Sequence, residues 1–219
     1  MRVFLWDLDG TLIDSGATII GSIRQALAAC GLPDVPEEQA RGCVGPPLIE
    51  GLPRFCGVPL DAVHDVIAEY RRIYGATMTS APIYPEVIET IEAATRHGVI
   101  HAIATAKPEV AAREILAAKN LTDHFTVITG ADPTRGINHK EQVVELCLNR
   151  LTEAGIETSA AVMIGDRRYD MEGARVNGID AVFVAWGYGS PSEADGFPIV
   201  HAPSELLAEW EPAPGQGQP

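Results

Sequence analysis

The chain has 219 residues, of which 46% are hydrophobic, so it can form one large domain or one domain with an insertion. Its formal net charge of −14 argues against a nucleic acid polymer or an anionic membrane as the main partner. A phosphorylated substrate is still compatible with this charge, because a bound divalent cation reverses the local sign. We find no signal peptide, no membrane span and no CxxC spacing among the four cysteines, and therefore expect a cytoplasmic protein with reduced thiols.

Five short, nearly continuous apolar runs are typical of strands that are buried on both faces of a parallel sheet. They cover residues 3–6, 100–105, 125–129, 160–165 and 181–186. Helical patterns separate the last four runs, at residues 108–120, 140–155 and 169–178. This alternation predicts an α/β fold: a Rossmann-like, three-layer core whose parallel strands are joined by right-handed crossovers.

A much longer segment, of roughly 90 residues, separates the first predicted strand from the second, and a plain crossover needs far fewer. Within it, residues 18–31 and 60–78 have amphipathic helical patterns, and residues 85–98 predict a helix leading to the second strand. We therefore expect an all-helical cap at 15–84, inserted into a discontinuous core formed by 1–14 and 85–219. The Pro/Gly/Gln-rich stretch 211–219 is expected to be a flexible tail.

Acidic, hydroxyl and lysine side chains follow the ends of several predicted strands. Ligands of open parallel sheets bind at the carboxyl ends of the strands, so these residues are expected to share one rim. The set comprises Asp7, Asp9, Gly10 and Thr11 after the first strand, Thr105, Ala106 and Lys107 after the second, Asp166 and Asp170 after the fourth, and Lys140 at the start of the preceding helix. Carboxylates packed this closely repel each other unless a cation lies among them, and oxygen ligands favour Mg²⁺.

This arrangement predicts phosphoryl transfer. Asp7 is expected to attack phosphorus as a nucleophile and to form an aspartyl-phosphate. Asp9 reaches the same site if the backbone turns, which Gly10 makes easy; it would protonate the leaving alcohol and then deprotonate the hydrolytic water. Mg²⁺ would shield the phosphoryl charge, while Thr105 and Lys140 would hold the equatorial oxygens.

Each of these signals also has an ordinary structural explanation. The DLDG stretch alone fits a turn, a helix cap or half of a calcium loop, although an EF-hand is excluded because its required glycine falls at Leu12. Taken singly, Thr105 is more often a strand-end hydroxyl, Lys140 a solvated helix residue and Lys107 a structural or solvated residue. Their order on matching strand ends, together with the GDRRYD stretch, favours the catalytic explanation.

In this order DLDGT (7–11), ATAK (104–107), Lys140 and GDRRYD (165–170) resemble the four motifs of the haloacid dehalogenase-like hydrolases, over nearly the whole chain. The resemblance implies a Rossmann-like core with a helical cap of the C1 type, Asp7 as nucleophile and Asp9 as general acid/base. It implies Mg²⁺ held by Asp7, the Asp9 backbone carbonyl and Asp166, with Asp170 close by or bound through water. The phosphate-binding set implied is Gly10, Thr11, Thr105, the Ala106 backbone and Lys140. An aspartate at the second acid position points to phosphoryl chemistry instead of carbon–halogen cleavage.

Two further stretches, GCVGPPLIEGL (42–52) and AWGYGS (185–190), are similar to a phosphoglycolate phosphatase-like or 5′-nucleotidase-like branch of this superfamily. That branch also includes an actinobacterial protein described as a tyrosine kinase on the same fold. Ala106 is a departure, because Asn or Ser is common at this position. A backbone amide contact survives that change and a side-chain contact does not, so we expect weaker or more selective substrate anchoring.

The expected cap contains the candidate specificity residues Gly45, Pro46 and Arg54. The proline-rich stretch 44–48 is rigid and is expected to reach the phosphate site, and its prolines equally fit the first turn of a helix. The two explanations are compatible. The candidate anion contacts of the cap, which also fit solvated surface positions, are Arg24, Arg54, Arg71 and Arg72.

We therefore predict a Mg²⁺-dependent phosphatase acting on a small phosphorylated metabolite such as phosphoglycolate or a nucleoside monophosphate. One alternative is a phosphotransferase, either a mutase or a tyrosine kinase, that uses the same aspartates; the absence of a Walker A motif disfavours an ordinary nucleotide kinase. Another is a binding protein that has lost catalysis. The intact set of Asp7, Asp9, Lys140 and Asp166 argues against the latter, because mutually repelling acids have little structural use. Oligomeric state is not predicted.

Overall fold

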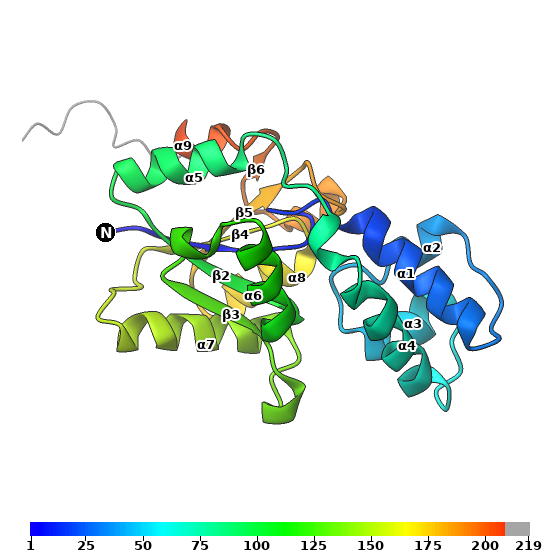
Figure 1. The fold of residues 1–219 in the computed structure, drawn as a ribbon. Coiled ribbons are helices and arrows are strands. Elements are labelled where there is room, and N and C mark those ends of the chain that lie inside the picture. Colours follow the sequence, from blue (N-terminus) through cyan, green and yellow to red (C-terminus); the bar gives the residue numbers. More distant parts are fainter. Residues whose placement is uncertain (209–219) are drawn as a thin grey trace, which may run out of the picture.

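The computed structural model describes residues 1–208, which form a parallel β-sheet between layers of helices, with further helices beside the sheet (Figure 1). The sheet has six strands in the order β3-β2-β1-β4-β5-β6. They are β1 Val3–Trp6, β2 Ile100–Pro108, β3 Val127–Ala131, β4 Ala161–Gly165, β5 Asp180–Val184 and β6 Ile199–Val200. The predicted α/β, Rossmann-like fold is confirmed. The expected tail at 211–219 lies outside the described residues.

All five predicted strands are present, with shifted ends. β3 begins at Val127, where pairing with Ala102 of β2 starts, and not at Phe125. β6 was not predicted, because its two residues are too few to stand out as an apolar run; it pairs with β5 through Phe183 and Ile199. The pairing of β2 with β3 shifts register between Thr105 and Pro108, so this end of β2 departs from regular pairing.

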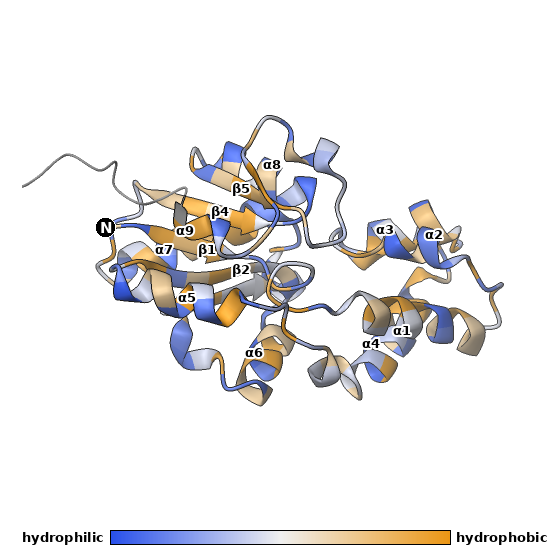
Figure 2. Cartoon of the chain, turned by 90° about the horizontal axis from the view of Figure 1, so that it is seen from above, coloured by the Kyte–Doolittle hydropathy of each residue, from blue (hydrophilic) through white to orange (hydrophobic). Residues whose placement is uncertain are grey.

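Alternate residues of the strands pack against helices on opposite faces of the sheet. Phe4 and Trp6 belong to one buried cluster, whereas Val3 and Leu5 belong to the other. The first face is covered by α5 Val87–Arg96, α6 Glu109–Ala118 and α9 Glu205–Ala208, and the second by α7 Lys140–Glu153 and α8 Arg168–Val176. Figure 2 shows the apolar colour concentrated on the central strands, as burial on both faces requires.

Four helices form a separate group beside the carboxyl end of the sheet (Figure 1), and we call this group the cap. They are α1 Gly16–Ala29, α2 Glu37–Arg41, α3 Leu48–Cys56 and α4 Val63–Gly75, followed by a 3₁₀ turn, η1 Met78–Ser80. The helices α2 and α3 were not predicted; Pro47 directly precedes α3, as the helix-start explanation of the prolines expects. The outgoing and returning chains lie side by side, since Asp14 N donates to Pro82 O at 2.9 Å.

No helix within residues 1–208 is both long and apolar enough to cross a membrane.

His101 of β2 is buried, and its Nδ1 accepts a hydrogen bond from Trp6 Nε1 at 3.0 Å. Burial lowers the pKa of His101 from 6.5 to about 4, because a charged imidazolium would lose its hydration. Between these two values the unfolded chain binds a proton that the folded chain does not. The free energy of unfolding is therefore expected to decrease by up to about 3 kcal/mol as the pH falls through this range.

The test is urea denaturation of the wild type and of His101→Gln, which does not titrate, at a series of pH values from neutral to acidic. Other groups titrate in the same range, so the measured quantity is the difference between the two proteins. We expect the wild type to lose about 3 kcal/mol more than the variant on acidification. Parallel curves for the two proteins would contradict the assignment of this proton to His101.

Candidate functional site

Asp7 directly follows β1 and so lies at the carboxyl edge of the sheet, and the chain turns sharply after Leu8. After Leu8 the backbone curls back, so that Leu12 N donates to Leu8 O at 3.0 Å. Gly10 has a positive φ of 85°, and a Cβ added there would lie 2.4 Å from Asp166 Oδ2. A residue with a side chain is therefore excluded at Gly10 both by its backbone conformation and by the neighbouring carboxylate.

The two carboxylates of the DLDG stretch reach the same edge but face different partners. Asp7 Oδ1 lies 2.8 Å from Lys140 Nζ. Asp9 Oδ1 accepts a hydrogen bond from Ser15 Oγ at 2.6 Å, and Asp9 Oδ2 lies 2.8 Å from Lys107 Nζ. The sequence places Lys107 at this rim, although a structural or solvated role is its more frequent explanation; its side chain is buried and contacts Asp9. The turn thus separates a nucleophile candidate from an acid/base candidate.

Three buried carboxylates form a cluster behind this edge: those of Asp7, Asp166 and Asp170 each have one oxygen within 4.8 Å of the others. Lys140 Nζ contacts two of them, Asp7 Oδ1 at 2.8 Å and Asp170 Oδ1 at 2.6 Å, and also donates to the Ala104 carbonyl at 2.9 Å. The contacts of Lys140 with these two carboxylate oxygens are ion pairs without hydrogen-bond geometry, and neither oxygen has another hydrogen-bond partner among the described residues. The ammonium of Lys140 therefore contacts two of the three carboxylates of the cluster.

The pKa values in the cluster show the resulting excess of negative charge. Burial, followed by the charges of Asp170 and Asp7, raises the pKa of Asp166 well above its usual range. Burial also raises the pKa of Asp170 to about 6, although the Lys140 ammonium counteracts this. Burial lowers the pKa of Lys140, but Asp170 and Asp7 outweigh it, and the net shift is upward. A bound cation would relieve this repulsion, so the oxygen donors here fit a hard metal ion.

A glycine-containing loop after β5 fixes Asp166 in the cluster. Tyr188 N donates to Asp166 Oδ2 at 2.7 Å, and Thr11 Oγ1 donates to Asp166 Oδ1 at 3.4 Å. A Cβ on Gly187 would lie 2.3 Å from the Asp166 Cβ, so this close approach requires glycine. In the sequence this loop is recognisable only by its family resemblance; the pair of glycines that flank Tyr188 is the signal of its close approach to Asp166.

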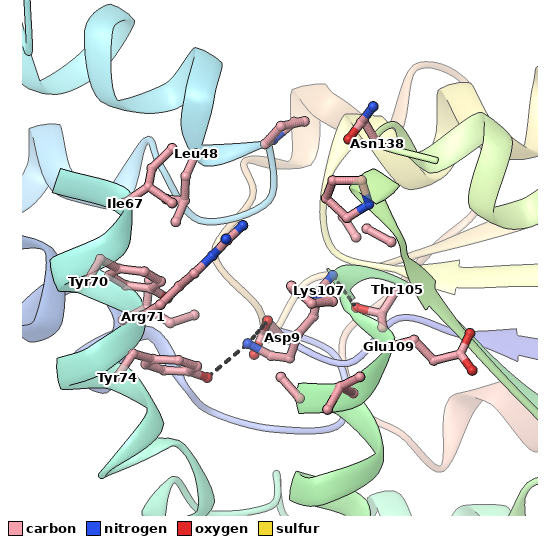
Figure 3. A pocket seen from close by; sticks show the side chains of 18 of the residues that line it. Asp9, Leu48, Ile67, Tyr70, Arg71, Tyr74, Thr105, Lys107, Glu109 and Asn138 are labelled. Atoms are coloured by element: carbon pink, nitrogen blue, oxygen red, sulfur yellow. Dashed lines mark hydrogen bonds and ion pairs between the residues drawn. The ribbon is translucent and has the colours of Figure 1, made fainter. Parts of the chain in front are cut away.

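A cleft of about 1150 Å³ lies between the cap and this edge of the sheet. The predicted residues that line it are Asp7, Asp9, Thr105, Ala106, Lys107, Gly45, Pro46 and Arg71. Helix α4 contributes Tyr70, Arg71 and Tyr74 from the cap side (Figure 3). Figure 3 also shows the Arg71 side chain extending from α4 into the cleft.

Several predicted residues do not line the cleft. The hydroxyl of Thr11 faces Asp166, and Gly10 packs against the same carboxylate. The guanidinium of Arg54 lies over the Phe55 ring, 5.0 Å from its centroid. The remaining predicted residues outside the lining set are Lys140, Asp166 and Asp170, which are buried, and Arg24 and Arg72, which pair with Asp34 and Glu69.

The fold and site define an α/β protein with a buried carboxylate cluster at the carboxyl edge of its sheet, next to a helix-covered cleft. The family model for haloacid dehalogenase-like hydrolases matches residues 4–184, and the chain belongs to this family. The predicted resemblance is therefore confirmed. This family is one of hydrolases, and relatives named 5′-nucleotidase and phosphoglycolate phosphatase agree with the predicted phosphoric monoester hydrolase.

Two kinds of relatives are informative. The chain is 38% identical over 192 residues to a tyrosine-protein kinase, PtkA, of Mycobacterium tuberculosis, covering 86% of this chain but 63% of that protein. It is 30% identical over 205 residues to a 5′-nucleotidase of Pseudomonas aeruginosa, covering 93% of this chain and 91% of that protein.

The structural neighbours extend over nearly the whole chain. A predicted phosphatase from Clostridium acetobutylicum has a TM-score of 0.86 at 28% identity, covering 95% of this chain and 97% of that chain. The structure of Mycobacterium tuberculosis PtkA has a TM-score of 0.80 at 33% identity, covering 94% of this chain and 96% of that chain. The same architecture therefore accommodates proteins described as phosphatase and as kinase.

Proposed function

We propose that the protein is a Mg²⁺-dependent phosphatase that hydrolyses a small phosphomonoester through an aspartyl-phosphate. The observation that carries this proposal is the position of Asp7, which lines the cleft and also belongs to the carboxylate cluster. A carboxylate that is open to a substrate on one side and close to a cation site on the other suits attack on an anionic phosphoryl group.

The reaction would proceed in two steps at Asp7. In the first, an Asp7 oxygen forms a bond to phosphorus while the ester P–O bond breaks, and Asp9 gives a proton to the leaving oxygen. In the second, a water oxygen attacks phosphorus, Asp9 takes the proton of that water, and the bond from phosphorus to Asp7 breaks. Inorganic phosphate leaves, and both aspartates return to their starting states.

The other residues of the site would hold the phosphoryl group and the metal ion. Asp7, the Asp9 carbonyl and Asp166 would bind Mg²⁺, with Asp170 close by. The bound ion would neutralise phosphoryl charge. The Thr105 hydroxyl, the Ala106 amide and Lys140 would contact the phosphoryl oxygens, with Gly10 and Thr11 as the further members of the proposed set.

The substrate would enter through the cleft, where Gly45 and Pro46 are the proposed specificity residues. The cleft volume of about 1150 Å³ is larger than the smallest phosphomonoesters would fill. Along the wall of the cleft the rings of Tyr70 and Tyr74 stack on each other, with their centroids 5.3 Å apart. Arg71 adds a positive charge at the same wall. Relatives named 5′-nucleotidase and phosphoglycolate phosphatase (the latter from Pectobacterium atrosepticum, 29% identical) support both nucleotides and small phosphorylated acids as candidates.

The test is phosphate release from a panel of phosphomonoesters, measured with added Mg²⁺ and with a chelator. The panel contains phosphoglycolate, nucleoside monophosphates, sugar phosphates, pyridoxal phosphate and phosphotyrosine. We expect release that is concentrated on one class, is lost in the chelator and returns with excess Mg²⁺, because the three carboxylates repel the substrate without a cation. Release that is equally fast in the chelator would contradict metal dependence, and no release from any ester would contradict the phosphatase.

The kinase-named relatives support a second candidate, transfer of the phosphoryl group from Asp7 to an acceptor other than water. The chain spans 63% of the length of these mycobacterial relatives, so their activity is a proposal here and not a property of the chain. Tyrosine-containing protein added to the panel distinguishes the two candidates. Transfer would label the tyrosine and reduce phosphate release, whereas a phosphatase would release phosphate at the same rate with or without this acceptor.

A further inference from the structure

Lys107 occupies an unusual position for a lysine beside a substrate cleft. It belongs to β2, at the place where the pairing with β3 is irregular, and its side chain is 5% exposed. Its Nζ lies 2.8 Å from Asp9 Oδ2 (Figure 3), while its backbone N donates to Thr105 Oγ1 at 3.2 Å. A buried ammonium needs such partners, because it has given up its hydration.

The other partner of this ammonium comes from the cap. Lys107 Nζ donates to the Tyr74 hydroxyl at 2.9 Å and lies 4.5 Å from the centroid of the Tyr74 ring. Tyr74 is in the last turn of α4, and its ring stacks on that of Tyr70 one turn earlier, with an interplanar angle of 8°. One charged group therefore touches Asp9 on the sheet side and an aromatic residue of the cap.

We propose that Lys107 is a positioning residue for Asp9, and that Tyr74 makes this positioning depend on the cap being seated against the sheet. The proposal rests on the proposed function, because it assigns Lys107 a role through the acid/base Asp9. Neither Lys107 nor Tyr74 is required to transfer a proton or to bind the phosphoryl group.

The geometry explains how the positioning would work. Ser15 contacts Asp9 Oδ1 and Lys107 contacts Asp9 Oδ2, so the side chain is fixed at both oxygens. Lys107 would hold Oδ2 throughout, and the proton that Asp9 gives to the leaving oxygen would be carried on Oδ1. If the cap moved away, Lys107 would lose its contacts with Tyr74 and become hydrated. Its ion pair with Asp9 would then be weaker, because the local dielectric constant would be higher. Asp9 would thus be held for proton transfer when the cap covers the cleft and excludes bulk water.

The experiment uses substrates that differ in their need for an acid. Aryl phosphates such as p-nitrophenyl phosphate have a stable leaving anion, whereas alkyl phosphates such as phosphoglycolate require a proton on the leaving oxygen. For Lys107→Met we expect kcat to fall about 100-fold on alkyl phosphates and less than about threefold on aryl phosphates, with little change in KM. For Tyr74→Phe, which keeps the ring and removes the hydroxyl, we expect the same pattern at about tenfold.

The matched control is Lys119→Met, because Lys119 Nζ donates to the Thr79 carbonyl at 3.2 Å and also links the sheet side to the segment returning from the cap. It has no contact with Asp9, so both substrate classes should react at wild-type rates. Circular dichroism and thermal melting establish that each variant is folded, and Tyr74→Phe remains informative if Lys107→Met does not fold.

The outcomes separate the two proposals. An equal loss on both substrate classes, a loss confined to KM, or unchanged rates in a folded Lys107→Met or Tyr74→Phe protein would overturn the positioning role and leave the phosphatase intact. A wild type that releases phosphate from neither class would overturn the proposed function, and the role of Lys107 with it.

Discussion

Asp7→Asn is expected to lower phosphate release by at least about 10⁴-fold, which is the scale of effect seen when a covalent nucleophile is removed from an enzyme. The amide retains the shape of the carboxylate but is a far weaker nucleophile, so the aspartyl-phosphate cannot form. The site would keep its cleft and its neighbouring residues. Loss of turnover in this variant would therefore report the chemistry of Asp7 and not the architecture of the site.

The fold should survive this change, because Asn has the volume of Asp and Lys140 keeps its ion pair with Asp170 at 2.6 Å and its hydrogen bond to the Ala104 carbonyl at 2.9 Å. The buried ammonium is therefore not left without partners. Neutralising Asp7 also removes a charge that lies close to the carboxyl groups of Asp166 and Asp170. We expect the melting temperature of Asp7→Asn to stay within a few degrees of the wild type.

The measurements are steady-state phosphate release and thermal melting of Asp7→Asn. The control is Asp123→Asn, an exposed aspartate in a 3₁₀ turn, which should match the wild type in both. Acid quenching and mass spectrometry during turnover should detect a phosphorylated wild-type chain and an unmodified variant. Activity of Asp7→Asn within tenfold of the wild type would show that Asp7 is not the nucleophile.

Lys140→Met is expected to destabilise the protein strongly. It removes the ammonium that contacts Asp7 and Asp170 and leaves three carboxylates buried without it. Breaking a buried ion pair in this way costs about 3–5 kcal/mol, which corresponds to a fall in melting temperature of roughly 6–20 °C for a chain of this size. Phosphate release should fall as well, since the proposed phosphoryl contact is lost.

Divalent cations provide the discriminating measurement for this variant. Without Lys140 the carboxylate cluster is more negative, so saturating Mg²⁺ should raise the melting temperature of Lys140→Met by more than that of the wild type. The control is Lys119→Met, whose ammonium lies outside the cluster and whose response to Mg²⁺ should equal that of the wild type. A Lys140→Met protein that melts like the wild type without metal would contradict the charge assignment.

The sequence predicted the parts of the site that depend on local pattern. The DLDG stretch follows an apolar run, and the topology of a parallel sheet then places Asp7 near Asp166 and Asp170 without knowledge of their side-chain contacts. The apolar runs in the sequence predicted five of the six strands. β6 was not predicted, because two residues are too few to form a recognisable apolar run.

The contacts that were missed depend on where distant segments meet. Lys107 is in contact with Tyr74, which lies 33 positions away on α4, and no periodicity in the sequence links the two. The role of the loop around Tyr188 likewise depends on its approach to Asp166 across the edge of the sheet. Arg54 was expected at the cleft because of its charge, but the course of α3 places its guanidinium over Phe55 instead.

The paired connections at the base of the cap bear on how this protein could be redesigned. Because Asp14 and Pro82 are hydrogen-bonded neighbours, a cap from another protein of the family could be spliced in at these two points without altering the strands that carry the aspartates. If the cap selects the substrate, as proposed for Gly45 and Pro46, such a chimera would act on the donor's substrates. The new cap would also need an aromatic hydroxyl at the position of Tyr74. A cap selected only for its substrate pocket would leave the ammonium of Lys107 without its partner from the cap.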